Sequence, residues 1–180
     1  MALPIATGIL VILLGVDRPA FAADSNGNRS SAPDFPFLGT VQPRHAREIA
    51  DSNWSVGGET LDRDFARFAS YRDWLGPLGI KRIRFQCGWA KCERMPGAYD
   101  WAWLDEAVNG AIEQGLRPWL EVNYGNPVYQ GGGGTNLGAG LPTSTVALAA
   151  WDKWIGTLVS RYRDRVHEWE VWNEPDGGRL

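Results

Sequence analysis

The stretch LRPWLEVNY, residues 116–124, decides the fold that this sequence predicts. It is short and largely apolar, as a buried strand is, and Pro118 stands near its start, where a strand tolerates proline. Glu121 and Asn123 interrupt the apolar run two residues apart, so their side chains share one face of the strand. The same polar stripe recurs in two further predicted strands, residues 80–86 with Arg82 and Arg84, and residues 166–173 with Glu168 and Glu170.

Helical patterns separate these strands. Apolar residues recur at helical spacing over residues 62–76, 101–114 and 143–164, and a less definite strand covers residues 47–56. A glycine-rich loop runs over residues 125–142. Strands that alternate with helices predict βαβ units and a parallel sheet. In the last helix the residues expected to face inward are Val146, Ala150, Trp154, Leu158 and either Tyr162 or Val159.

Two architectures fit this alternation, an open doubly wound sheet and a (β/α)8 barrel. The central strands of an open sheet are near-continuous apolar runs, whereas the strands here carry charges on one face. The interior of a barrel accommodates such a stripe, with the charges paired between strands. We therefore expect an α/β fold, the N-terminal half (strands 1–4) of a TIM (β/α)8 barrel. Because such a barrel needs about 250 residues, the chain of 180 residues is expected to be a fragment.

The first 40 residues are expected to lie outside the barrel. Residues 5–16 form an apolar run too short to span a bilayer, and Ala20-Phe21-Ala22 follows as an A-x-A cleavage pattern. This pattern predicts a signal peptide over residues 1–22, with a buried N-terminal helix as the alternative. A flexible leader over residues 23–40 and a partial barrel domain over residues 41–180 complete the predicted organisation. The mature protein would then be secreted or periplasmic, with no membrane attachment.

The composition argues against a nucleic-acid binder and leaves the cysteines open. Lys and Arg number 18 against 21 Asp and Glu, so the formal net charge is −3, without the basic surplus that polyanion binding needs. Cys87 and Cys92 can form a disulfide if the backbone turns back, or they remain free. No nearby His or second Cys pair completes a metal site, and we expect no cofactor. Ten Trp residues indicate a Trp-rich core or a surface for flat ligands such as sugar rings.

The chemistry is expected where the strands end, because active sites of such barrels lie at the carboxyl ends of the strands. The sharpest candidate is Glu174, which stands between Trp172 and Pro175 and directly follows Asn173. Partial desolvation by these neighbours would raise the pKa of the Glu174 carboxyl, as a general acid near neutral pH requires. The Asn173 amide can donate to a substrate hydroxyl. The alternative is that Glu174 is a surface carboxylate that caps the next helix.

The tetrapeptide Trp172-Asn173-Glu174-Pro175 resembles the strand-4 signature of the clan of retaining glycoside hydrolases with (β/α)8 barrels, which includes families 5, 39 and 42. Three further segments resemble that clan in the same order. Residues 79–85 are similar to its strand 2, residues 89–105 to the W…E…G.YDW..LD stretch that follows, and residues 116–127 to its strand 3. The resemblance covers about residues 60–177, and family 39 or an unassigned relative is the nearest.

This resemblance implies hydrolysis of O-glycosidic bonds in a carbohydrate substrate by a retaining double displacement. It implies that Glu174 is the acid/base, that Asn173 binds the sugar 2-hydroxyl, and that Arg84 supports the nucleophile. In these families the nucleophile comes from strand 7, so no carboxylate of this chain is assigned to it. We therefore expect the chain of 180 residues alone not to hydrolyse glycosides.

Other residues near the strand ends are candidates for substrate binding. Trp89, Tyr124 and Trp172 either stack on sugar rings or pack in the core. Asn123 stands with Tyr124 at the end of strand 3, where family 5 has a His, and Glu93 is either a loop carboxylate or a substrate ligand. The alternative function is a non-catalytic carbohydrate-binding or scaffold half-barrel. A reading frame that continues into strands 5–8 would favour the enzyme.

Overall fold

The computed structural model describes residues 38–136 and 140–174. The chain divides into two compact units, residues 1–40 and 41–180, and the fold described below belongs to the second. The predicted signal peptide and most of the predicted leader lie outside the described residues. Within the described ranges, no helix is both long and apolar enough to cross a membrane.

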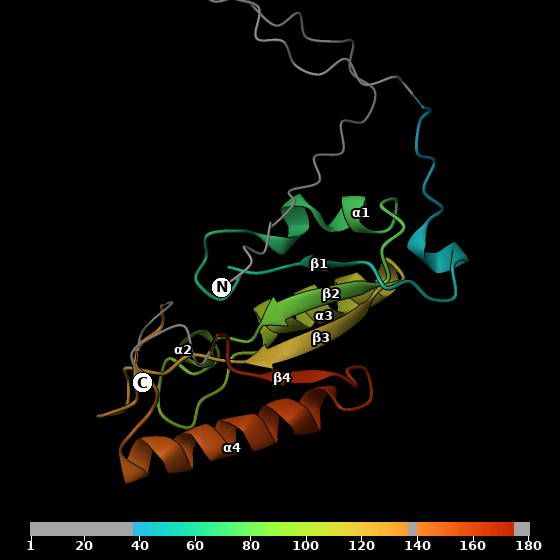
Figure 1. The fold of residues 1–180 in the computed structure, drawn as a ribbon. Coiled ribbons are helices and arrows are strands. Elements are labelled where there is room, and N and C mark those ends of the chain that lie inside the picture. Colours follow the sequence, from blue (N-terminus) through green and yellow to red (C-terminus); the bar gives the residue numbers. More distant parts are fainter. Residues whose placement is uncertain (1–37, 137–139, 175–180) are drawn as a thin grey trace, which may run out of the picture. The chain divides into compact units, whose positions relative to one another are not determined.

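Four parallel strands form one sheet in the order β1, β2, β3, β4 (Figure 1). The strands are β1 (Ser55–Gly57), β2 (Arg82–Gln86), β3 (Arg117–Val122) and β4 (Trp169–Val171). Their register places Arg84 beside Trp119, and Glu121 beside Glu170. The predicted α/β fold with a parallel sheet is confirmed.

Two longer helices connect these strands, α3 (Ala102–Glu113) and α4 (Thr145–Tyr162). Each begins beside a side chain that accepts from an otherwise unpaired backbone N–H. Ser144 Oγ accepts from Ala147 N at 3.1 Å, and Asp100 Oδ1 accepts from Ala102 N at 3.0 Å. In Figure 1, α3 lies behind β2 and β3. The shorter helical segments are η1 (Ala46–Glu48), η2 (Phe68–Ser70), α1 (Arg72–Leu75) and α2 (Trp89–Cys92).

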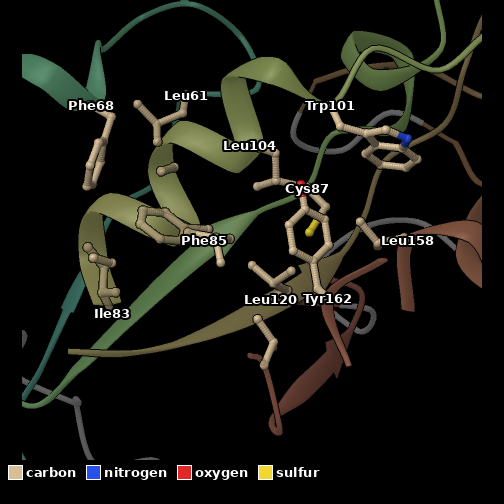
Figure 2. Close-up of a cluster of buried hydrophobic side chains, with 14 of the residues drawn as sticks. Leu61, Phe68, Ile83, Phe85, Cys87, Trp101, Leu104, Leu120, Leu158 and Tyr162 are labelled. Atoms are coloured by element: carbon tan, nitrogen blue, oxygen red, sulfur yellow. The ribbon is translucent and has the colours of Figure 1, made fainter. Parts of the chain in front are cut away.

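The apolar core lies between one face of the sheet and the two longer helices. Figure 2 shows strand side chains pointing toward those of the helices. Fully buried members of this cluster are Ile83, Phe85, Leu104, Leu120, Leu158 and Tyr162. Because successive side chains alternate between the faces of a strand, Arg84 and Glu121 lie on the opposite, inner face.

The predicted helix over residues 62–76 is wrong in its first half. Turns occupy this part, and Thr60 and Asp64 adopt left-handed backbone angles, with φ of 69° and 59°. Lys91, from α2, donates to Asp64 Oδ1 at 2.6 Å and also to the carbonyl of Leu61, which holds the segment in its irregular path. A contact with a residue so distant in sequence overrides local helical spacing. Only the short η2 and α1 follow.

Two predicted strands are shorter than expected. Residues 47–56 contain the end of η1 and the start of β1, and β4 occupies only three of residues 166–173. Helix α4 agrees with its predicted span, and Trp154 and Leu158 are fully buried as expected. Val146 is instead 67% exposed, whereas the next residue, Ala147, is fully buried, so Ala147 and not Val146 faces inward in the first turn.

The two cysteines are buried free thiols. Cys92 Sγ donates to the Cys87 carbonyl oxygen at 3.2 Å, so the α2 turn brings the residues together without a bridge. Burial raises the pKa of Cys92 to about 12, which keeps its thiol protonated and unreactive. Of the two alternatives for this pair, the structure therefore shows the free form.

Candidate active site

Arg84 is the centre of the polar inner face. Its guanidinium forms a two-point contact with Glu170 of β4, with Nε 2.8 Å from Oε2 and Nη2 2.7 Å from Oε1. Nη1 donates to Glu59, which follows β1, at 2.7 Å. The hydrogen bond from Arg84 is the main cause that lowers the pKa of Glu170. The expected pairing of opposite charges between strands is thus confirmed, here between β2 and β4, which flank β3. Arg82 repeats it with Glu168, which directly precedes β4, at 2.6 and 2.7 Å.

Glu121 of β3 lies against the same guanidinium but is bonded differently. Its Oε2 is 2.8 Å from Arg84 Nη2, and its side chain is fully buried. In the described part of the chain, neither oxygen of Glu121 accepts a hydrogen bond of good geometry, although the Gln86 side chain lies beside it and lowers its pKa. Burial is the main cause that raises the pKa of Glu121 to about 7. The inner face therefore contains a carboxyl group that is close to half-protonated at neutral pH.

Asn173 joins this cluster at the carboxyl end of β4. Its Oδ1 accepts from Arg84 Nη2 at 3.0 Å, while the backbone N–H of Trp172 donates to Val122 O at 3.0 Å and continues the pairing with β3. The side chain of Asn173 is half-buried. Of the predicted site residues, the structure thus brings Arg84 and Asn173 into direct contact.

Tyr124 and Trp172 lie together at the ends of β3 and β4. Their rings meet edge to face, with centroids 6.1 Å apart. Tyr124 is buried, its hydroxyl accepts from Gln86 Nε2 at 3.1 Å, and Arg63 lies over its ring at 5.3 Å. Trp172 is half-buried. Trp172 therefore offers a partly open ring, whereas both the ring and the hydroxyl of Tyr124 contact protein groups.

Three non-glycine residues at these strand ends have left-handed backbone angles. The φ values are 53° for Tyr124, 65° for Trp172 and 46° for Glu174. Such conformations are unfavourable for residues with a Cβ, and they gather at functional sites. Glu174 is also exposed, so the partial desolvation expected from its neighbours is not seen within the described residues. Pro175, one of those neighbours, lies outside the described residues.

Trp89 has no exposed face in this structure. Its ring stacks between Tyr129, at 5.4 Å, and Trp154, at 6.0 Å, and it is fully buried. Its Nε1 donates to Glu93 Oε2 at 2.5 Å. Of the two alternatives for Trp89, the structure therefore shows core packing, because no ring face remains for a sugar.

Glu93 is a structural carboxylate. It is buried and accepts from three donors, namely Trp89 Nε1, Gly97 N at 2.5 Å and Tyr129 Oη at 2.7 Å. Its backbone oxygen also accepts from Asn126 Nδ2 at 2.7 Å. This bonding corresponds to the loop-carboxylate alternative and leaves Glu93 no role as a substrate ligand.

Asn123 is likewise buried, below the surface of the site. Its Oδ1 accepts from Gly88 N at 3.2 Å, which ties the end of β3 to the loop after β2. Its Nδ2 has no partner among the described residues. Asn123 thus lies beneath the strand ends, and its assignment to substrate binding stays a prediction.

A groove of about 520 Å³ opens on the inner face, with Arg82, Trp119, Glu168 and Glu170 in its lining. Trp119 Nε1 donates to Glu170 Oε2 at 3.2 Å across the groove floor. Within residues 38–136 and 140–174, no group of three or more His, Cys, Asp and Glu side chains is arranged to hold a metal ion. The groove is therefore a polar, hydrogen-bonding surface.

Sequence reasoning missed the parts of the Arg84 cluster that come from other strands. Glu59 follows β1 by two residues, and no sequence pattern marks it. The polar stripe of residues 116–124 includes Glu121 but does not predict its partner. The signal that finds Glu121 is register: it pairs with Glu170 and lies two residues beyond Trp119, which pairs with Arg84. The alternation of side chains along the strand predicts that Glu121 lies on the inner face, and the strand register identifies the residues beside it.

No protein-family model matches the sequence, and the comparison with curated proteins found no match either. Solved structures do match. The chain is similar to a β-galactosidase from the haloarchaeon Halorubrum lacusprofundi, at 16% identity and a TM-score of 0.53, over 68% of this chain and 21% of that one. It is similar to a β-galactosidase from the psychrophilic Marinomonas ef1, at 20% identity and a TM-score of 0.53, over 68% and 22%.

A family 39 glycoside hydrolase from Bacteroides cellulosilyticus WH2 is also similar, at 25% identity and a TM-score of 0.46, over 61% of this chain and 21% of that one. In all three cases the match spans about a fifth of the solved chain. The two β-galactosidases, with the order and parallel pairing of the four strands, show the fold. The chain has the α/β architecture of one part of a TIM barrel.

Proposed function

We propose that this chain provides the strand-4 end of an active site that hydrolyses O-glycosidic bonds in carbohydrates, with Glu174 as the acid/base. The observation that carries the proposal is the hydrogen bond from Arg84 to Asn173, which anchors the residue before Glu174 at the carboxyl edge of the sheet. In a barrel of this architecture, that edge is where catalytic groups lie. The likeness in fold to two β-galactosidases supports the same reaction class.

The proposed reaction is a double displacement with retention at the anomeric carbon. Glu174 protonates the departing glycosidic oxygen while a second carboxylate attacks the anomeric carbon. Glu174, now ionised, then takes a proton from the water that hydrolyses the glycosyl-enzyme. The exposure of Glu174 suits this role, because a substrate oxygen can reach an exposed carboxyl directly.

The nucleophile is not assigned to any described residue. It has to lie about 5–5.5 Å from the acid/base and present a free oxygen to the sugar. Glu170 and Glu59 both accept hydrogen bonds from Arg84, and Glu121 is fully buried beneath that guanidinium. None of the three presents the exposed, unpaired carboxylate that nucleophilic attack needs.

Asn173 and Trp172 are the proposed sugar contacts. Because Asn173 Oδ1 accepts from Arg84, its NH2 group is directed away from the guanidinium, and we assign that group to donate to a sugar hydroxyl. Trp172 is half-buried beside Tyr124 and retains a partly open ring for stacking. The substrate class is therefore a glycoside, an oligosaccharide or a polysaccharide.

The test uses the natural gene product that contains these residues and the Glu174→Ala variant. Hydrolysis of a phenyl glycoside, whose leaving group needs a proton, should fall about 10²–10⁴-fold. A dinitrophenyl glycoside needs no proton to depart, so its glycosyl-enzyme still forms, and added azide, which needs no general base, should restore turnover. The product of that rescue should be a glycosyl azide of retained configuration. Glu168→Ala, which changes the residue just before β4 that pairs with Arg82, is the matched control and should behave as wild type.

Full activity of Glu174→Ala on the phenyl glycoside would refute the acid/base assignment. Wild-type protein that binds sugars in calorimetry but hydrolyses none would instead support the non-catalytic carbohydrate-binding alternative. Inverted configuration in the azide product would overturn the retaining mechanism while leaving glycoside hydrolysis in place.

A further inference from the structure

The hydrogens of Arg84 Nη2 are fewer than the acceptors around them. An Nη nitrogen carries two hydrogens, and three acceptor atoms lie within 3.0 Å of this one. They are Glu170 Oε1 at 2.7 Å, Glu121 Oε2 at 2.8 Å and Asn173 Oδ1 at 3.0 Å. One acceptor must therefore lack a hydrogen bond. In the structure that acceptor is Glu121, although it is nearer to Nη2 than Asn173 is.

Two of the other three hydrogens of Arg84 already have acceptors. Nε donates to Glu170, and one of the two Nη1 hydrogens is donated to Glu59. Glu121 is fully buried, so no bulk water reaches its oxygens. An ionised carboxylate without hydrogen bonds in such a place is strongly unfavourable, whereas a protonated one is tolerated. In the structure Arg84 donates to Asn173 and not to Glu121, and this arrangement therefore fits a protonated Glu121.

Ionisation of Glu121 reverses the preference. A carboxylate accepts from a guanidinium about twice as strongly as a neutral amide does, and Glu121 Oε2 already lies at hydrogen-bond distance. We propose that Glu121 is a positioning residue. While Glu121 is protonated, Arg84 Nη2 donates a hydrogen bond to Asn173. When Glu121 loses its proton to solvent, Nη2 donates that hydrogen to Glu121 instead, and Asn173 is released. The hydrogen bond from Arg84 to Asn173 therefore depends on pH.

The surroundings of Glu121 place this change near neutral pH. The charged groups that face it are Arg84 on β2, Glu170 on β4 and Glu59 after β1, while Cys87 and Tyr124 nearby have raised pKa values and stay neutral. Burial has the largest effect and opposes ionisation, and the two carboxylates add to it, whereas the Arg84 guanidinium and the neighbouring Gln86 side chain favour the ionised form. The pKa of about 7 that results for Glu121 puts both forms within the working range of most enzymes.

A nuclear magnetic resonance titration of the full chain tests the proposal without any substrate. The Glu121 carboxyl ¹³C signal and the Asn173 side-chain NH2 signal, the latter assigned by its absence in Asn173→Ala, should titrate together with a midpoint near 7. In Glu121→Gln the competing acceptor is a neutral amide at every pH, so the Asn173 signal should no longer move through that range. Glu168→Gln, which removes a carboxylate paired with Arg82, should leave both midpoints unchanged.

Two results would overturn the proposal. One is an Asn173 signal that does not titrate in the wild type or that titrates unchanged in Glu121→Gln. The other needs no variant: midpoints for Glu121 and Asn173 in the wild type that differ by more than about one pH unit would show that they are not coupled.

A kinetic experiment connects this residue to the reaction, and this part alone rests on the proposed function. In the natural gene product, kcat/KM for an aryl glycoside should fall about fivefold as Glu121 ionises, the factor expected for one lost hydrogen bond. Glu121→Gln should abolish this fivefold fall. If no glycoside is hydrolysed, the proposed function fails, and the titration still decides the role of Glu121.

Discussion

Two regions of this molecule bury a glutamate, and they treat it in opposite ways. In the loop after α2, Glu93 accepts from a ring N–H, a backbone N–H and a phenol. On the inner face of the sheet, Glu121 is buried as completely but accepts no hydrogen bond from the described residues. Glu93 holds its loop in one conformation. Glu121 leaves its neighbours with more than one arrangement of hydrogen bonds.

The difference shows that the burial of a carboxylate does not by itself indicate whether the residue serves stability or a functional site. A fully bonded buried carboxylate contributes to stability, since each of its donors would otherwise be orphaned. A buried carboxylate without such bonds opposes folding, and it persists in a protein where another requirement retains it. We infer that the loop after α2 is built for stability and that the sheet face is built for the site.

The largest expected effect is in the stabilising region. Glu93→Ala leaves Trp89 Nε1, Gly97 N and Tyr129 Oη buried without an acceptor. We expect the free energy of unfolding to fall by about 4 kcal/mol, measured by urea denaturation. Glu93→Gln, which keeps one acceptor oxygen, should lose about half as much. A loss below about 1 kcal/mol for Glu93→Ala would remove the distinction between the two regions.

The next effect has the opposite sign and depends on pH. The pKa of Glu121 rises from 4.5 to about 7 on folding, so between these values the folded chain retains a proton that the unfolded chain releases. Wild-type stability should therefore decrease as pH rises through this window and level off above 7, by at most about 3 kcal/mol in total. Glu121→Gln lacks the group and should be the more stable protein at high pH, with little difference below 4.5.

Urea denaturation on both sides of the window checks this expectation. A Glu121→Gln protein that is less stable than wild type above pH 7 would show that the ionised carboxylate is well accommodated. Glu121 would then resemble Glu93, and the contrast between the two regions would disappear.

The smallest effect separates a core tryptophan from one at the strand ends. Trp89→Phe keeps an aromatic ring between Tyr129 and Trp154 but removes the N–H that Glu93 accepts. It should lower the free energy of unfolding by about 2 kcal/mol. Trp172→Phe, at a half-buried position, should change it by about 0.5 kcal/mol or less. Equal losses from the two substitutions would indicate that both rings are core residues.

Much of the fold follows from the sequence because its signals are local. The polar stripes at Arg84 and Glu121 predict both the strands and their inward faces, and the spacing of Trp154 and Leu158 predicts α4. The segment around Asp64 could not be predicted in this way. Its path depends on Lys91, from a different element, and helical spacing carries no information about that contact.

The candidate site was predictable to the same extent. The strand ends and the residues on them are visible in the sequence, and the contact of Arg84 with Asn173 joins two of them. The burial of Trp89 depends on Tyr129, which comes from a glycine-rich loop without periodicity. The absence of a well-formed hydrogen bond at Glu121 depends on how the two Nη2 hydrogens of Arg84 are shared among three acceptors, and residue spacing carries no information about that.

The left-handed backbone at Tyr124, Trp172 and Glu174 has a consequence for the evolution and engineering of this protein. Glycine would relax the main chain at Glu174, which is exposed, but it would remove the proposed acid/base. At Tyr124, which is buried, glycine would also remove a packed ring and lower stability. Heat tolerance and turnover therefore favour different residues at Glu174, so directed evolution of that position has to score both properties together.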